Sequence, residues 1–189
     1  YVPLSHMYSI YDWRTDMDAA EMRDVILDID DKVSENNGWH PSMIVAGGCA
    51  MILNGWSSRR NTDDIDVLDC DRDLNDVLSE FPQVNCNVNA YGDQIPYNYE
   101  DRLREMPIDT SAVSVLTPSL EDLVVMKLYA WRGKDVDDLT SDGTLSCVDW
   151  DLLDYLVTSD NEARASVLSD MTYQTLLYRY LDYADMYRR

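Results

Sequence analysis

Apolar residues recur along this chain with two different periods, and these periods alternate through its first half. Over residues 16–35 they fall at three- and four-residue intervals, which predicts an amphipathic helix that stops at Asn36-Asn37-Gly38. Short apolar runs predict buried strands at residues 43–46 and 64–69, with helices at residues 48–54 and 74–80. The chain therefore opens with alternating helices and strands.

The second half is predicted to be mostly helical after two further strands. A third strand is expected over residues 84–90 and a fourth near residues 112–116. Thr117-Pro118 then starts a helix, because proline costs nothing in a first turn. The predicted helices cover residues 118–130, 135–142, 150–158 and 161–189. We expect an α/β (α+β) fold with a mixed sheet of about four or five strands flanked by helices.

The same pattern divides the chain into three parts. Ser5-His6-Met7 has the form of a cloning junction, so residues 1–6 are interpreted as a vector remnant. Residues 7–140 are expected to form the α/β domain, and residues 141–189 a helical extension packed on it.

Charge limits the partners that this protein can bind. The sequence has 36 acidic and 15 basic residues, a formal charge of -21, which repels a polyanion over most of the surface. The scarce cations cluster in two segments, as Arg59, Arg60, Lys127, Arg132 and Lys134. A cationic pocket in an acidic protein suits a nucleoside triphosphate, with or without one locally docked RNA end.

Two classes of protein are disfavoured by composition. No apolar run is long enough to span a bilayer and no secretory leader pattern is seen, so a cytoplasmic location is expected. The four cysteines lack Cys-x-x-Cys or Cys/His spacing, which favours free thiols over a zinc site or a disulfide framework.

The candidate chemistry lies between residues 47 and 66. Asp64 and Asp66 alternate along a predicted strand and should project from the same face, as paired carboxylates that hold magnesium do. Gly47-Gly48 follows the strand at 43–46, and glycine allows a tight turn and a close approach to phosphate. The helix that follows would present its N-terminal amides to an anion.

These segments resemble the DNA polymerase beta-like nucleotidyltransferase superfamily, whose signature is a strand, a Gly-Gly or Gly-Ser turn, a short helix and an Asp-x-Asp strand. The resemblance is closest to bacterial nucleotidyltransferase-like proteins of uncharacterised or toxin-antitoxin type. Their pattern is matched by Gly47, Gly48, Ala50, Gly55, Arg60, Thr62, Asp64 and Asp66. A second motif of the same branch is matched from Val115 to Leu139, and the resemblance covers roughly residues 43 to 139.

The resemblance implies metal-dependent transfer of a nucleoside monophosphate from an NTP to a hydroxyl. Asp64 and Asp66 would bind Mg²⁺ or Mn²⁺, and Lys127 would reach the cleft, although a helical lysine can also turn outward. Gly47, Gly48, Arg60 and Thr62 would form the nucleotide-binding turn. Arg60 has two open roles, a phosphate contact or an ion pair that supports the metal site. Arg132 is expected to join Asp135 and Asp138 at a helix junction.

One departure leaves catalysis open. The superfamily has a third carboxylate on a later strand, where this chain offers asparagines, with Asn87 and Asn89 as the candidates and Asp93 as a substitute. An amide supplies neither charge nor a base. The alternative is therefore a catalytically degenerate nucleotide- or partner-binding protein, such as a toxin-antitoxin component. The aromatic stripe of the last helix would be core, or the face that binds a protein partner or a second copy.

Overall fold

A mixed five-stranded sheet is the centre of the computed structural model, which describes residues 16–35, 38–86, 94–167 and 169–189. The strand order is β5-β4-β2-β7-β6, and β1 pairs with β3 in a separate two-stranded ribbon. The strands are β1 (Met17–Asp18), β2 (Ser42–Ala46), β3 (Asn61–Thr62), β4 (Ile65–Cys70), β5 (Val84–Asn85), β6 (Arg104–Glu105) and β7 (Ser114–Thr117). The predicted α/β class with a mixed sheet is confirmed.

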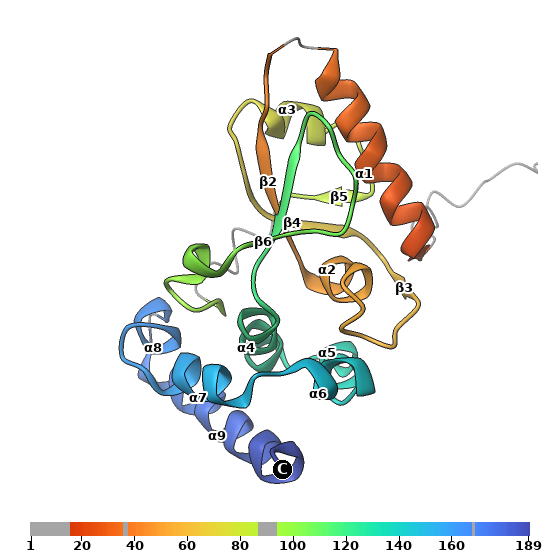
Figure 1. Ribbon diagram of the computed structural model, residues 1–189. Coiled ribbons are helices and arrows are strands. Elements are labelled where there is room, and N and C mark those ends of the chain that lie inside the picture. Colours follow the sequence, from red (N-terminus) through yellow and green to blue (C-terminus); the bar gives the residue numbers. More distant parts are fainter. Residues whose placement is uncertain (1–15, 36–37, 87–93, 168) are drawn as a thin grey trace, which may run out of the picture.

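Helices surround this sheet and form most of the C-terminal part. They are α1 (Ala19–Ser34), α2 (Gly47–Leu53), α3 (Leu74–Leu78), the 3-10 helix η2 (Tyr99–Arg102), α4 (Leu120–Ala130), α5 (Gly133–Leu139), α6 (Asp142–Cys147), α7 (Trp150–Thr158), α8 (Ala163–Ser166) and α9 (Asp170–Tyr187). In Figure 1 the sheet and α1 occupy the upper half of the molecule and α4 to α9 the lower half, with α2 between them. None of the helices within the described ranges combines the length and apolar character needed to cross a membrane.

The central strand β2 connects the two halves of the sheet. It pairs antiparallel with β4 and parallel with β7, and its residues Met43–Ala46 are buried. Since neighbouring strand residues point to opposite faces, this continuous burial means that both faces of the sheet are covered here. The chain turns at Gly47 directly after β2. Because β2 and β4 are antiparallel, this turn lies beside the first residues of β4.

Helix α1 is fixed at its start and near its end by carboxylates. The Asp18 carboxylate accepts hydrogen bonds from the amides of Ala20 and Glu21, and Glu21 accepts one from the Asp18 amide, which completes a capping box. Near the other end, buried Asp30 accepts bonds from the amides of residues 111–113 and from the Ser111 hydroxyl. These bonds join α1 to the segment that leads into β7.

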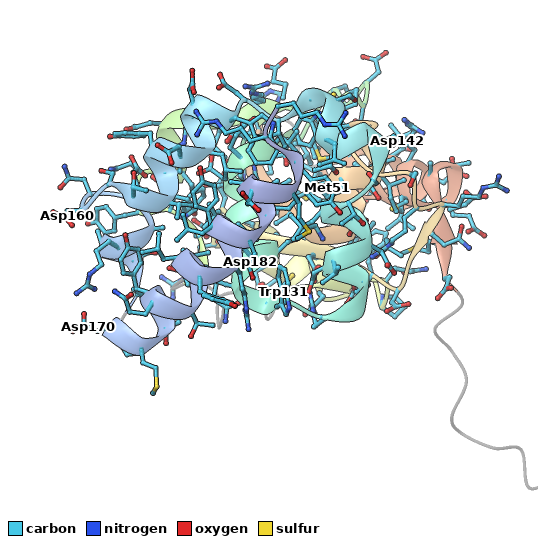
Figure 2. The ribbon with its side chains drawn as sticks, turned by 90° about the horizontal axis from the view of Figure 1, so that it is seen from below. Met51, Trp131, Asp142, Asp160, Asp170 and Asp182 are labelled. Carbon is cyan, nitrogen blue, oxygen red and sulfur yellow. The ribbon has the colours of Figure 1, made fainter. Side chains whose placement is uncertain are left out.

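Helix α9 completes the helical half by packing on α4 and α7. The Arg179 guanidinium donates to the carbonyls of Leu128 and Tyr129 at the end of α4 and lies over the Trp131 ring. The Tyr183 hydroxyl donates to the Leu139 carbonyl over 2.7 Å. Figure 2 looks onto this helix from below, with Asp170 at its start.

Several predicted boundaries need correction. Residues 161–189 do not form one helix, because the chain leaves the helical conformation between α8 and α9. The predicted strand at 84–90 is β5 at Val84–Asn85, and residues 87–90 lie outside the described residues, as do residues 1–15 with the predicted vector remnant. Helix α6 and the two-residue strands β1, β3 and β6 were not predicted.

Candidate active site

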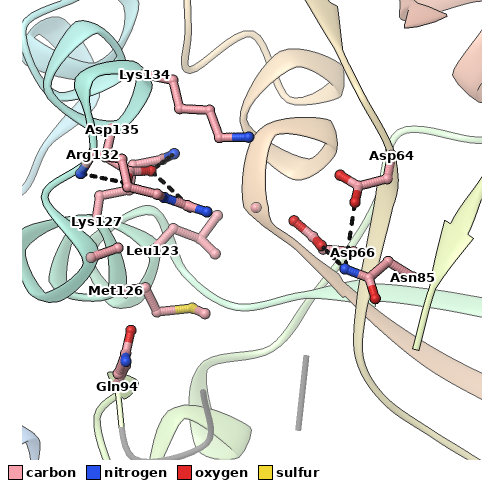
Figure 3. A pocket seen from close by; sticks show the side chains of 12 residues that line it. Asp64, Asp66, Asn85, Gln94, Leu123, Met126, Lys127, Arg132, Lys134 and Asp135 are labelled. Carbon is pink, nitrogen blue, oxygen red and sulfur yellow. Dashed lines mark hydrogen bonds and ion pairs between the residues drawn. The ribbon is translucent and has the colours of Figure 1, made fainter. Parts of the chain in front are cut away.

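Two carboxylates and an amide meet at the start of β4. Asp64 immediately precedes the strand and Asp66 lies in it, opposite Asn85 of β5 in the parallel register. The Asn85 side-chain amide donates to Asp66 Oδ1 over 3.0 Å and to Asp64 Oδ2 over 3.4 Å. All three residues line one pocket, and Asp64 and Asp66 project into it together, as expected for side chains on the same face (Figure 3).

The glycine turn brings the backbone against this acid pair. Gly47 has φ +65°, and a Cβ there would collide with Asp66 Oδ2 and lie 3.1 Å from its Cγ. At Gly48 a Cβ would lie 2.7 Å from both Thr62 Oγ1 and Arg59 Nη2. Both positions therefore require glycine, Gly47 for its left-handed conformation and both for lack of space. Gly47 lines the pocket, whereas Gly48 packs behind it on Thr62.

The electrostatics of the acid pair favour a bound cation. Burial, and secondly the charge of Asp64, raise the pKa of Asp66 to about 6, and the Asn85 bond, Lys134 and Arg132 oppose this rise. Lys134 and Arg132 thus act on Asp66 from the other side of the pocket, where Figure 3 shows them. A metal-bound anion would be attracted from both sides of the pocket, because the carboxylates attract its metal and Lys134 and Arg132 attract the anion.

Lys127 is buried in an ion-pair network. Its Nζ lies 2.7 Å from Asp138 Oδ2 and 3.4 Å from Asp135 Oδ1. Asp138 is fully buried and also accepts from the Ser57 hydroxyl and the Arg59 guanidinium. Lys127 lines the pocket, in agreement with the expectation that it reaches the cleft. Its charge, however, is already balanced by two carboxylates. Its position therefore holds α4 and α5 together.

Of the other predicted site residues, some line the pocket and others pack behind the residues that line it. Arg132 pairs with Asp135 over 2.7 Å across the junction between α4 and α5, and it lines the pocket as well. Thr62 is buried in β3, behind the glycine turn. Arg60 is exposed and is not among the described residues that line the pocket. Its neighbour Arg59 lies beside Gly48 instead.

The lining residues that were not predicted as site residues are Asn85, Gln94, Leu123, Met126 and Ala130, whereas Lys134 belongs to the predicted cationic cluster. The candidates Asn87, Asn89 and Asp93 lie outside the described residues. Asn85 stood in the same predicted strand, and the register Asp66↔Asn85 is the signal that separates it from Asn87. Gln94 lies between two predicted strands, where no pattern in the sequence indicated its role.

The oxygen donors of this site fit magnesium in part. The two carboxylates are hard ligands, whereas Asn85 turns its amide nitrogen toward them, and Mg²⁺ normally adds waters and phosphate oxygens to one or two carboxylates. The described residues contain no group of three His, Cys, Asp or Glu side chains arranged to hold a metal. A bound ion would therefore need oxygen atoms from the nucleotide as well as Asp64 and Asp66.

The fold and this site define a class of protein. A glycine turn between a strand and a helix, next to an Asp-x-Asp pair, is the arrangement of a nucleotidyltransferase. Residues 20–188 match the family described as nucleotidyltransferase of unknown function (DUF6036), and the chain belongs to this family. No curated protein and no solved structure matches the chain.

Proposed function

We propose that this protein is a metal-dependent nucleotidyltransferase that moves a nucleoside monophosphate from an NTP to a hydroxyl acceptor. The observation that carries the proposal is the Asp64 and Asp66 pair, which faces Lys134 and Arg132 across one pocket. The cationic wall would neutralise the triphosphate, and the acidic wall would hold its metal. Membership of a nucleotidyltransferase family supports this function.

Each part of the pocket has a distinct task in this proposal. Asp64 and Asp66 would hold Mg²⁺ or Mn²⁺, which stabilises developing charge on phosphate oxygens and lowers the pKa of an attacking hydroxyl. Gly47 leaves room for the Asp66 carboxylate, and its lack of a Cβ would let the phosphates approach the backbone. Lys134 and Arg132 would contact the phosphate chain, while Lys127 fixes the helix pair that carries them.

The decisive experiment is calorimetric titration with each NTP in the presence of Mg²⁺ or Mn²⁺. The double variant Asp64→Asn/Asp66→Asn should lose metal-dependent binding. Asp24→Asn/Asp28→Asn removes the same charge from exposed positions of α1 and should bind normally. If the unmodified protein shows no metal-dependent triphosphate binding, the proposal is wrong. Transfer of labelled nucleotide to RNA, protein or small-molecule acceptors then identifies the acceptor.

A second function, nucleotide binding without turnover, is favoured by Asn85. Its amide lies beside Asp66 on the strand where the resemblance expects a third carboxylate, and an amide cannot act as a base. Metal-dependent binding with no transfer to any acceptor would support this alternative over the enzyme.

Such a binding protein would also use a partner, as a toxin-antitoxin component does. The outer side of α9 exposes Met171, Tyr178 and Leu181, with exposed fractions of 79%, 69% and 56%. We propose this face for a protein partner or a second copy of the chain. Sedimentation of the protein and of a Tyr178→Lys/Leu181→Lys variant tests the second copy: a dimer that the variant abolishes supports it.

A further inference from the structure

The pocket has a second end whose chemistry differs from that of the acid pair. Leu123, Met126 and Ala130 recur at three- and four-residue intervals on α4, and all three line the pocket. Gln94 lines the same pocket, and in Figure 3 its amide lies below Met126, away from Arg132 and Lys134. Apolar side chains of α4 therefore line the pocket on both sides of Lys127 in the sequence, and a neutral amide lies at the end of the pocket away from Arg132 and Lys134.

Gln94 contributes a side-chain amide to the lining of the pocket. Among the described residues, none forms a hydrogen bond with this side chain, which is only partly buried. A carboxamide offers a donor and an acceptor side by side, so it is complementary to any flat group whose edge presents an acceptor next to a donor. Apolar side chains and a polarizable thioether nearby suit the face of an aromatic ring.

We propose that this end of the pocket binds an adenine base, with Leu123, Met126 and Ala130 against its face and Gln94 hydrogen-bonded to its edge. This inference rests on the proposed function, because it assumes that the triphosphate lies at the acidic and cationic end. The two ends then recognise the two halves of one nucleotide.

Adenine fits this end better than guanine does. The amino group of adenine has an acceptor nitrogen on either side, so the amide can pair bidentately with it on both edges. Guanine presents two adjacent acceptors on its major-groove edge, which mismatch the amide, and only its O6 and N1–H offer an acceptor next to a donor. When the amide pairs with O6 and N1–H, the 2-amino group of guanine would face apolar side chains without a partner, and burial of an unpaired polar group is costly.

The test separates the base from the phosphates. Binding of ATP, GTP and inorganic tripolyphosphate, each with Mg²⁺, is measured by calorimetry for the unmodified protein, Gln94→Leu and the control Gln174→Leu. Gln174 is exposed on α9, so the control makes the same chemical change far from the pocket. We expect Gln94→Leu to weaken ATP binding about ten-fold, as the loss of one or two neutral hydrogen bonds does, and tripolyphosphate binding less than two-fold.

Each outcome decides the inference. ATP binding that is tighter than GTP and tripolyphosphate binding, and that weakens only in Gln94→Leu, supports the adenine site. If ATP binds no tighter than tripolyphosphate, or if ATP and GTP bind equally, the adenine site is wrong while the triphosphate site stands. An equal loss of ATP and tripolyphosphate binding in Gln94→Leu also overturns it. Binding of none of the three ligands overturns both this inference and the proposed function.

Discussion

Replacement of Gly47 by alanine tests whether the glycine turn exists to accommodate the Asp66 carboxylate. Gly47 has φ +65° and Gly55 has φ +73°, so alanine at either position is strained by about 1 to 2 kcal/mol. Only at position 47 does the new methyl group meet another side chain, because a Cβ at Gly55 has nothing within 4 Å. Gly55→Ala is therefore a matched control for backbone strain.

The difference between the two variants follows from the collision with Asp66. To reach ordinary van der Waals contact, the alanine methyl and Asp66 Oδ2 must separate by about 1 Å. A displacement of about 1 Å at a catalytic group can lower a reaction rate about 100-fold, and we expect metal coordination by Asp66 to be as sensitive to its position. We expect Gly47→Ala to weaken Mg²⁺-ATP binding by that factor and Gly55→Ala to leave it within about two-fold.

Calorimetry and thermal unfolding measure the two effects separately. Both variants should unfold a few degrees below the unmodified protein, at about 2 to 4 °C per kcal/mol for a chain of this size. Only Gly47→Ala should also lose affinity. Equal Mg²⁺-ATP affinity in the two variants would refute the argument that the turn makes room for Asp66.

Three further predictions concern buried polar groups. Burial raises the pKa of Asp30, but the bonds from Ser111, Val113 and Ala112 outweigh it and hold that pKa below its usual value. Asp30→Asn should therefore cost about 3 kcal/mol at pH 7 in urea denaturation. This loss should shrink as the pH falls below about 4, since protonation of the unmodified carboxyl removes the same stabilisation, and a loss that stays constant down to pH 3 contradicts the argument. Lys127→Met should cost about 3 kcal/mol in the same assay, because Asp138 loses a buried partner, and unchanged stability would mean that the ion pair contributes nothing. Asn85→Asp should lower the melting temperature in EDTA, because three carboxylates then converge, and Mg²⁺ should raise it more than in the unmodified protein. A melting temperature of Asn85→Asp that does not respond to Mg²⁺ would argue against a metal at this site.

Long periodic segments were predictable from the sequence. The apolar stripe of α1 and the strand-turn-helix at residues 42–53 lie within a few residues of their expected positions, because their buried faces carry the period of the element. Strands of two residues, such as β1 and β3, are too short to carry a period. Their existence depends on tertiary pairing, Met17 with Thr62 and Asp18 with Asn61.

The surroundings of Lys127 were beyond sequence reasoning for a geometric reason. Helical spacing brings together residues three or four apart, but the partners of Lys127 are eight and eleven positions away. They reach it because α4 ends at Ala130, the next residue, Trp131, has a left-handed φ of +51°, and the chain then folds back as α5. A left-handed tryptophan has no sequence signal comparable to that of glycine.

The prediction of Arg60 as a residue of the nucleotide-binding turn depended on a one-residue difference from Arg59. Adjacent residues in extended chain point in opposite directions, so a one-residue difference decides which guanidinium faces the protein. The structure places Arg59 against Asp138 and the carbonyl of Asn61. The family pattern had selected the neighbouring position.

The hydrogen bonds that Asp30 accepts have a consequence for the order in which the protein folds. They join positions 81 to 83 residues apart in the sequence. The pairing of β2 with β7 is also long-range, whereas β2, α2 and β4 are close in sequence. Closure of a long loop is slow compared with local pairing. During synthesis, the glycine turn and Asp66 can come together soon after residue 70 is available, while α1 and the sheet are locked only when residues 111–117 arrive. We therefore expect the acidic half of the pocket to form early and the α4 wall to be the last part that completes it.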